Sequence, residues 1–98
     1  MSVDVRWRDR AIHEAQEAYE WYESRSKGTG ERLIAELDEH IEFLLKHPTG
    51  YPKWRSSYRK VTLKHFPYQV IYRFERGTIT IFSIFHGSRD PRHWGRSR

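Results

Sequence analysis

The residues best suited to chemistry lie close together near the carboxyl end of the chain, in residues 86–94 (HGSRDPRHW). This run holds two imidazoles and two guanidiniums, and guanidinium groups bind phosphate or carboxylate through paired hydrogen bonds. We therefore expect Arg89 and Arg92 to contact an anion. In the structural alternative, Asp90 and the following proline form a turn, Arg89 pairs with a carboxylate, and Trp94 packs on the edge of the core.

A second group of cations lies on sequence that alternates like a strand. Lys60, Thr62 and Lys64 alternate with apolar residues, and because alternate residues of a strand share a face, they point away from the core together. Strand register is expected to place Arg73 on an adjacent strand, and Arg59 adjoins Lys60 in the sequence. These cations either bind a partner or form a solvated outer face whose lysines guard the sheet against aggregation.

Other kinds of catalytic site have little support in the sequence. The chain has no cysteine, and its six histidines form no HExxH motif and no cluster with carboxylates at metal-ligand spacing. The sequence shows no Ser/His/Asp arrangement and no phosphate-binding loop. For general acid–base catalysis His65 and His86 are the best candidates, because imidazole titrates near neutrality. We expect no metal and no cofactor.

The charge of the chain is unevenly divided. Residues 49–98 hold 11 Lys+Arg and 2 Asp+Glu, a net of +9, whereas residues 1–48 hold 7 and 11, a net of −4. A basic surface repels itself unless an anion lies against it, so the candidate partners are nucleic acid, an acidic protein segment or a nucleic-acid-handling protein. The length of 98 residues predicts one domain. No apolar run approaches the ~20 residues that span a bilayer, so we expect a soluble, cytoplasmic protein.

Hydrophobic periodicity predicts the elements that must position these residues. Alternation at residues 3–7 predicts a strand, and apolar residues three and four apart predict two helices, separated by a turn at residues 24–30 and ended by Pro48. Asp9 is expected to cap the first helix. A loop is predicted at residues 49–57, followed by three strands. The expected fold is α+β: an N-terminal strand, an αα-hairpin and a three-stranded antiparallel β-sheet packed on the hairpin.

This order of elements, the phrase LKHFPYQVIY at residues 63–72 and the ending at residues 86–94 together resemble the RelE/ParE superfamily. Members are toxins of type II toxin–antitoxin systems, also described as plasmid stabilisation proteins. The resemblance covers essentially the whole chain and implies a single RelE/ParE-like toxin domain over residues 1–98.

Two branches of the superfamily imply different activities. RelE-like members are ribosome-dependent mRNA interferases that cleave RNA with basic residues on the sheet, and Lys60 and Arg89 stand where that branch has such residues. That branch also has an arginine after the tyrosine of the third strand and a second lysine, where this chain has Gln69 and Thr62. The FPY phrase and the HxxRDP ending look more like ParE, whose studied members poison DNA gyrase by protein–protein binding.

The resemblance therefore implies a ParE-like toxin that inhibits DNA gyrase or another topoisomerase and needs no catalytic residues. The alternative is a RelE-like endoribonuclease, in which Lys60, His86 and Arg89 would be catalytic. In both cases the resemblance implies a cognate acidic antitoxin, whose disordered tail folds on binding and forms a hetero-oligomer with the toxin. The residues expected to contact the target or the antitoxin are Arg59, Lys60, Lys64, Arg73, Arg89, Arg92 and Trp94.

Overall fold

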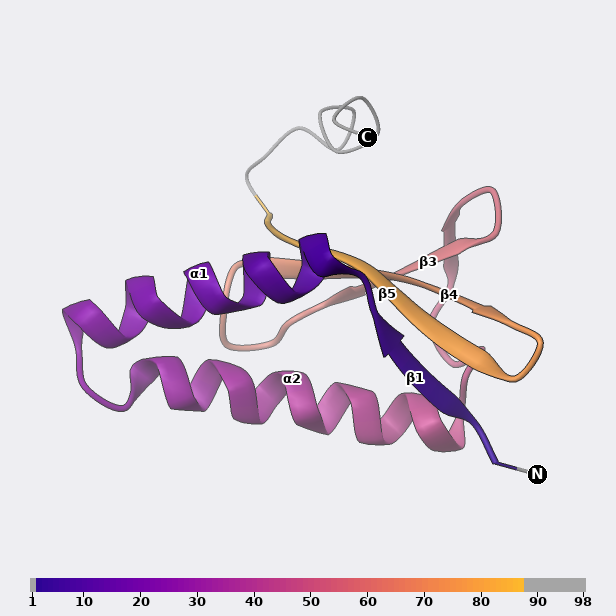
Figure 1. Cartoon of the computed structure of the whole chain (residues 1–98), viewed down its shortest axis with the longest axis horizontal. Coiled ribbons are helices and arrows are strands. Elements are labelled where there is room, and N and C mark those ends of the chain that lie inside the picture. The colour runs from indigo at the N-terminus through magenta and orange to yellow at the C-terminus, as the bar shows by residue number, and fades with distance from the viewer. Residues whose placement is uncertain (1, 88–98) are drawn as a thin grey trace.

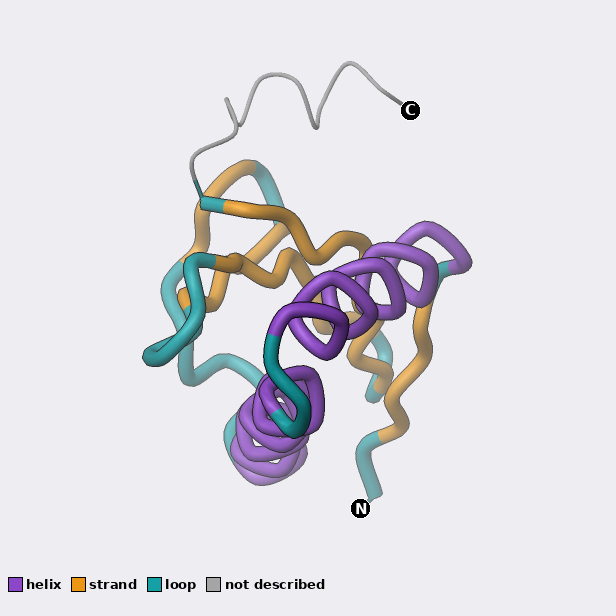
Figure 2. The backbone as a smooth tube through the Cα atoms, turned by 90° about the vertical axis from the view of Figure 1, so that its left-hand side faces the viewer, coloured by secondary structure: helices purple, strands orange, loops and turns teal. Residues whose placement is uncertain are grey.

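The computed structural model describes residues 2–87, which form a five-stranded sheet and a pair of helices. The two helices run side by side along one face of the sheet (Figure 1), and a view turned by 90° shows the same layers (Figure 2). This is the α+β class predicted from the sequence. Neither helix in this part of the chain is long and apolar enough to cross a membrane. In chain order the elements are β1 (Asp4–Trp7), α1 (Asp9–Arg25), α2 (Thr29–Lys46), β2 (Lys53–Arg55), β3 (Tyr58–Thr62), β4 (Tyr68–Glu75) and β5 (Thr78–His86).

The strand order of the sheet is β1-β5-β4-β3-β2, and β1 is parallel to β5 while the other neighbours are antiparallel. The N-terminal strand therefore lies at one edge, beside the last strand of the chain. The prediction of a loop at residues 49–57 is wrong in part, because β2 forms there and pairs with β3. With 3 residues, β2 is too short to produce a visible alternation in the sequence.

The main core lies between the helices and the inner face of the sheet. Ala11 and Ala18 of α1 are almost fully buried, and their small side chains let the helix lie close to β5. α2 adds leucines at helical spacing, and the strands add alternate residues, as their periodicity predicts. Each buried aliphatic side chain stabilises the fold by about 1.5–3 kcal/mol. The buried residues of this cluster are Ala11, Ala18, Leu33, Leu37, Leu44, Val61, Leu63, Val70, Tyr72, Ile79, Ile81 and Ile84.

A β-bulge interrupts the pairing of β4 with β5. Tyr72 pairs with Ile81 and Ile71 pairs with Ser83, so Phe82 is an extra residue in β5. The bulge shifts the alternation of β5 by one position. A second, smaller cluster, centred on the fully buried Ile71, lies on the other face of the sheet, away from the helices.

The turn between the helices is shorter than the predicted one at residues 24–30. Gly28 precedes α2 with a φ of 91°, but Gly30 lies inside the first turn of the helix. A glycine is required at position 30 because a Cβ there would lie 2.6 Å from the backbone oxygen of Tyr19. The carboxylate of Glu23 caps α2 by accepting hydrogen bonds from the amides of Gly28 and Gly30, at 2.8 and 2.9 Å. The predicted cap of α1 is also wrong: Asp9 is the first helical residue and Arg8 takes the cap position.

Candidate functional site

The face of the sheet that points away from the helices, here the outer face, carries aromatic rings beside its cations. Ile71 and Phe85 are buried at its centre, and they are covered by the half-buried rings of Trp54, Tyr58 and Phe82. β2 supplies Trp54, and the bulge supplies Phe82. Tyr58 precedes Lys60 by two residues. Because alternate residues of a strand share a face, the sequence could have predicted that Tyr58 lies beside Lys60.

Two cations of the outer face lie over the ring of Trp54. The Arg55 guanidinium lies 4.5 Å from the centroid of the Trp54 ring, and Lys60 Nζ lies 5.3 Å from it. A cation at this range is attracted by the ring, by about 0.5–1 kcal/mol at an exposed site. The ring therefore holds both side chains in place while their polar ends remain partly accessible to a ligand.

A second cation–ring group surrounds Phe82. The Arg73 guanidinium lies 5.0 Å from the centroid of Phe82 and 5.3 Å from that of Tyr58, and the Arg8 guanidinium lies 5.3 Å from Phe82. The rings of Tyr58 and Phe82 meet edge to face at 5.1 Å. Two predicted residues, Lys60 and Arg73, are thus brought to one face, together with Arg8 and Arg55, which the sequence reasoning missed.

The outer face is short of carboxylates. Arg73 Nε pairs with Glu75 at 3.2 Å. Among residues 2–87, Arg8, Arg55 and Lys60 have no carboxylate within ion-pair distance. Three positive charges that are held in place and have no counter-ion among the described residues favour an anionic ligand.

Two other predicted residues lie elsewhere. Arg59 pairs in register with Tyr72, which faces the helices, and its Nη1 donates a 2.6 Å hydrogen bond to the backbone oxygen of Tyr51. β3 ends at Thr62, so Lys64 lies in the following turn rather than on the strand face expected for it. The predicted row of four cations is therefore divided, and Lys60 and Arg73 remain together.

A buried carboxylate holds the turn after β3 against α2. Glu36 is 5% exposed and accepts hydrogen bonds from the backbone amides of Lys64 and His65. It also contacts His40 Nε2 at 3.2 Å and His65 Nδ1 at 3.3 Å, and His40 Nδ1 contacts the Tyr51 hydroxyl at 2.9 Å. Burial by itself raises the pKa of Glu36, but these hydrogen bonds outweigh it and hold the pKa below its usual value. No group of three metal-binding side chains in residues 2–87 is arranged to hold a metal ion.

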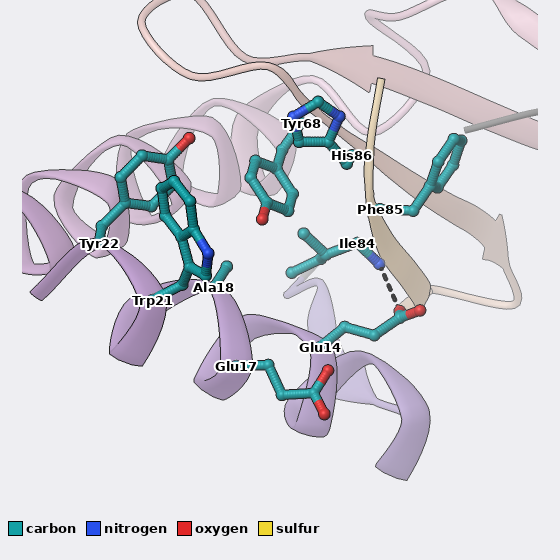
Figure 3. A pocket seen from close by; sticks show the side chains of 9 residues that line it. All are labelled: Glu14, Glu17, Ala18, Trp21, Tyr22, Tyr68, Ile84, Phe85 and His86. Carbon is teal, nitrogen blue, oxygen red and sulfur yellow. Dashed lines mark hydrogen bonds between the residues drawn. The ribbon is translucent and has the colours of Figure 1, made fainter. Parts of the chain in front are cut away.

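A groove of about 490 Å³ opens between α1 and the end of β5, here the α1–β5 groove. Trp21 of α1 stands on one side and Ile84 and Tyr68 stand on the other (Figure 3). His86, the last residue of β5, also lines the groove, and its ring meets the Tyr68 ring edge to face at 5.3 Å. The full lining is Glu14, Glu17, Ala18, Trp21, Tyr22, Tyr68, Ile84, Phe85 and His86.

His86 lies on the helix side of the sheet, away from the outer face. Tyr68 packs on the main core on the helix side, and His86 packs on Tyr68, whereas Lys60 contacts Trp54 on the opposite face. The structure thus does not bring His86 and Lys60 together. Three further predicted residues, Arg89, Arg92 and Trp94, lie outside the described residues.

Comparisons with known proteins give a consistent result. Residues 5–91 match the family described as "ParE toxin of type II toxin-antitoxin system, parDE". No curated protein sequence matches the chain.

Solved structures from toxin–antitoxin systems are similar to this chain. A chain of the chromosomal ParDE toxin–antitoxin system from P. aeruginosa is 18% identical with a TM-score of 0.72, covering 86% of this chain and 95% of that one. The isolated RelE toxin of E. coli is 14% identical with a TM-score of 0.64, covering 97% of this chain and 95% of that one. A mutant E. coli RelE in complex with an antitoxin RelB peptide is 14% identical with a TM-score of 0.62, covering 100% and 96%.

Proposed function

Because this chain belongs to the ParE family of toxins of type II toxin–antitoxin systems, we propose that it inhibits DNA gyrase or a related topoisomerase by protein–protein binding. The observation that carries this proposal is the outer face, where Arg8, Arg55 and Lys60 have no carboxylate partner within residues 2–87. A binding toxin needs a complementary surface and no catalytic group. Both the enzyme target and the antitoxin would lie in the bacterial cytoplasm, so the toxin acts there.

An acidic antitoxin is the proposed second partner of the outer face. A solved structure of E. coli RelE holds an antitoxin peptide, which supports an antitoxin for this toxin as well. Carboxylates of a disordered tail would pair with the outer-face cations, and such charge complementarity raises the association rate and the specificity. If the target and the antitoxin bind the same cations of the toxin, the antitoxin neutralises the toxin by competing with the target. The complex is then a hetero-oligomer.

A supercoiling assay with purified toxin and gyrase tests this proposal. The wild-type chain should block supercoiling, and the double substitution Arg55→Glu with Lys60→Glu should abolish the block by reversing two charges of the outer face. Lys27→Glu is the matched control, because Lys27 is exposed in the turn between the helices, far from that face in the fold (Figure 1). Supercoiling that continues unchanged with excess wild-type toxin would rule out the proposed target.

RNA cleavage is the second candidate function, and the outer-face rings are the observation in its favour. Surfaces for single-stranded nucleic acid combine cations with aromatic rings on which bases stack, and Lys60 lies beside Trp54. Against it, His86 lies on the other side of the sheet, so it could not act with Lys60 on one phosphate. Primer extension on translating ribosomes separates the two candidates. New 5′ ends that disappear with Lys60→Glu would support cleavage, and their absence would exclude it.

A further inference from the structure

The strand β1 lies at one edge of the sheet (Figure 1) and leaves that edge open to pairing. Among the described residues its one neighbouring strand is β5, and the amides of Asp4 and Arg8 donate hydrogen bonds of 3.0 Å to backbone oxygens on that side. Because alternate residues of a strand turn their backbone groups to opposite sides, the N–H and C=O groups of Val5 and Trp7 point away from the sheet. Such a row of backbone groups is a template for a further strand.

The side chains of β1 carry one charge of each sign. Asp4 and Arg6 are exposed on the outer face, whereas Val5 and Trp7 are half-buried against the main core. Neither Asp4 nor Arg6 has an ion-pair partner among residues 2–87. Two charges of like sign at these positions would repel a second copy of the strand, but one charge of each sign can attract it.

Antiparallel pairing of two copies of β1 about Val5 satisfies these groups together. Each Val5 would exchange backbone hydrogen bonds with Val5 of the second copy, and on the inner face Trp7 would lie opposite Val3. Asp4 of each chain would face Arg6 of the other, in the closely spaced position that has no hydrogen bonds. A slip of two residues would instead place Asp4 opposite Asp4 or Arg6 opposite Arg6. The charges therefore favour the register about Val5.

We propose that β1 is a self-association edge, through which two copies of this chain pair antiparallel about Val5 and join their five-stranded sheets into one. This inference goes beyond the proposed function and does not depend on it. The two-fold axis of such a pair is perpendicular to the sheet, so both outer faces lie on the same side. Lys60 and Arg55 lie on the strands farthest from β1 and stay accessible, so the dimer presents two cationic surfaces.

Sedimentation equilibrium of the full-length chain, made by cell-free synthesis, measures the self-association. Pairing through one short strand buries less than the about 1,200 Å² of a stable complex, so we expect a weak monomer–dimer equilibrium that shifts toward dimer as the protein concentration rises to ~0.5 mM. A chain that stays monomeric over this range would overturn the proposal. The measurement involves no gyrase, so its outcome is independent of the supercoiling assay.

Charge reversal on β1 tests the register. Asp4→Arg and Arg6→Asp should each weaken dimerisation ~10-fold or more, because two attractive cross-strand pairs become two repulsive ones. An equimolar mixture of the two variants should associate again, because each arginine then faces an aspartate. The chain that carries both substitutions should also dimerise, for the same reason.

Asp38→Arg is the matched control for Asp4→Arg. Asp38 is exposed on α2, and its replacement changes the net charge by the same amount, so the dimer should persist. A control that dissociates as Asp4→Arg does would show a general effect of charge and overturn the proposal. A mixture of Asp4→Arg and Arg6→Asp chains that stays monomeric would overturn it as well.

Hydrogen exchange measured by NMR locates the interface on the backbone. The amides of Val5 and Trp7 should exchange more slowly at high than at low protein concentration, because they gain acceptors in the dimer. The amides of Asp4 and Arg8, which already donate hydrogen bonds within the chain, should change little. A dimer that forms without protection of Val5 would show that the copies associate elsewhere, and the proposed edge would be wrong.

Discussion

Replacing the buried carboxylate of Glu36 should destabilise the fold more than any other conservative change of an acidic residue on α2. Glu36→Gln keeps the size of the side chain but removes its charge and one of its acceptor oxygens. In the native protein the backbone amides of Lys64 and His65 both donate hydrogen bonds to the carboxylate. The side-chain NH2 group of glutamine would face one of these two amides, donor against donor. The turn between β3 and β4 would lose its attachment to the helix.

The expected size of the effect follows from the contacts. A hydrogen bond to a charged group contributes about 1.5–3 kcal/mol, and leaving one partner unsatisfied costs about 1–3 kcal/mol. The backbone donors of Lys64 and His65 belong to exposed residues, so water can replace part of what Glu36 provides. We therefore expect Glu36→Gln to lower the free energy of unfolding at neutral pH by about 2 kcal/mol, near the middle of these ranges.

The effect should also depend on pH with a defined sign. Because the pKa of Glu36 in the folded state lies below its ordinary value of 4.5, the carboxylate contributes stability that is fully present above pH 4.5. This contribution is lost as the pH falls below 4.5 and through the folded-state pKa. The difference in unfolding free energy between wild type and Glu36→Gln should therefore shrink as the solution is acidified.

Urea unfolding followed by circular dichroism, at neutral pH and in steps below pH 4.5, measures both quantities. Glu39→Gln is the control, since Glu39 is exposed on the same helix and no hydrogen bond or ion pair holds it within residues 2–87; it should behave as wild type. A loss at neutral pH no larger than that of the control would refute the reasoning. So would a loss that stays constant below pH 4.5.

Three further changes test the packing around the helices. Gly30→Ala should lower the melting temperature, although alanine favours helix, because its Cβ would lie 2.6 Å from the backbone oxygen of Tyr19; a rise would contradict this contact. Glu14→Gln should speed hydrogen exchange of the Ile84 amide, which the carboxylate binds at 2.8 Å, and an unchanged rate would contradict that bond. Burial raises the pKa of Tyr72 above 10.0, so its stabilising contribution is present below pH 10 and is lost only above that value; in an absorbance titration, Tyr72→Phe should remove a tyrosine that ionises above pH 10.

The features predicted well from the sequence are those with a repeated local signal. Both helices and the strands β3, β4 and β5 were expected from apolar spacing that recurs over several residues. Because the spacing recurs, a single residue that departs from the pattern does not hide it. The turn before β5 also carries a local signal, a glycine at position 77, and Gly77 adopts a φ of 77° that other residues rarely take.

The features that were missed depend on contacts between distant segments. β2 is stabilised by pairing with β3 and by the burial of Trp54, neither of which a three-residue segment reveals. Glu36 resembles any exposed glutamate of α2 until the turn after β3 lies against it. Arg59 was expected to share a surface with Lys60, but neighbours in a strand point to opposite faces, and this rule could have separated them.

The same geometry bears on the two interpretations of the basic strands. Lysines that guard a sheet against aggregation belong on its edge strands, where unpaired backbone groups are exposed. In this sheet Arg73 lies on β4, which has a neighbour on both sides, whereas β2 pairs only with Tyr58 and Arg59 and leaves Lys60 beside the unpaired part of β3. Edge protection therefore does not explain Arg73. Both cations are also held over aromatic rings, which costs them side-chain freedom that a merely solvated surface would not require. The ordering of these cations over aromatic rings favours a ligand, and their positive charge favours an acidic one.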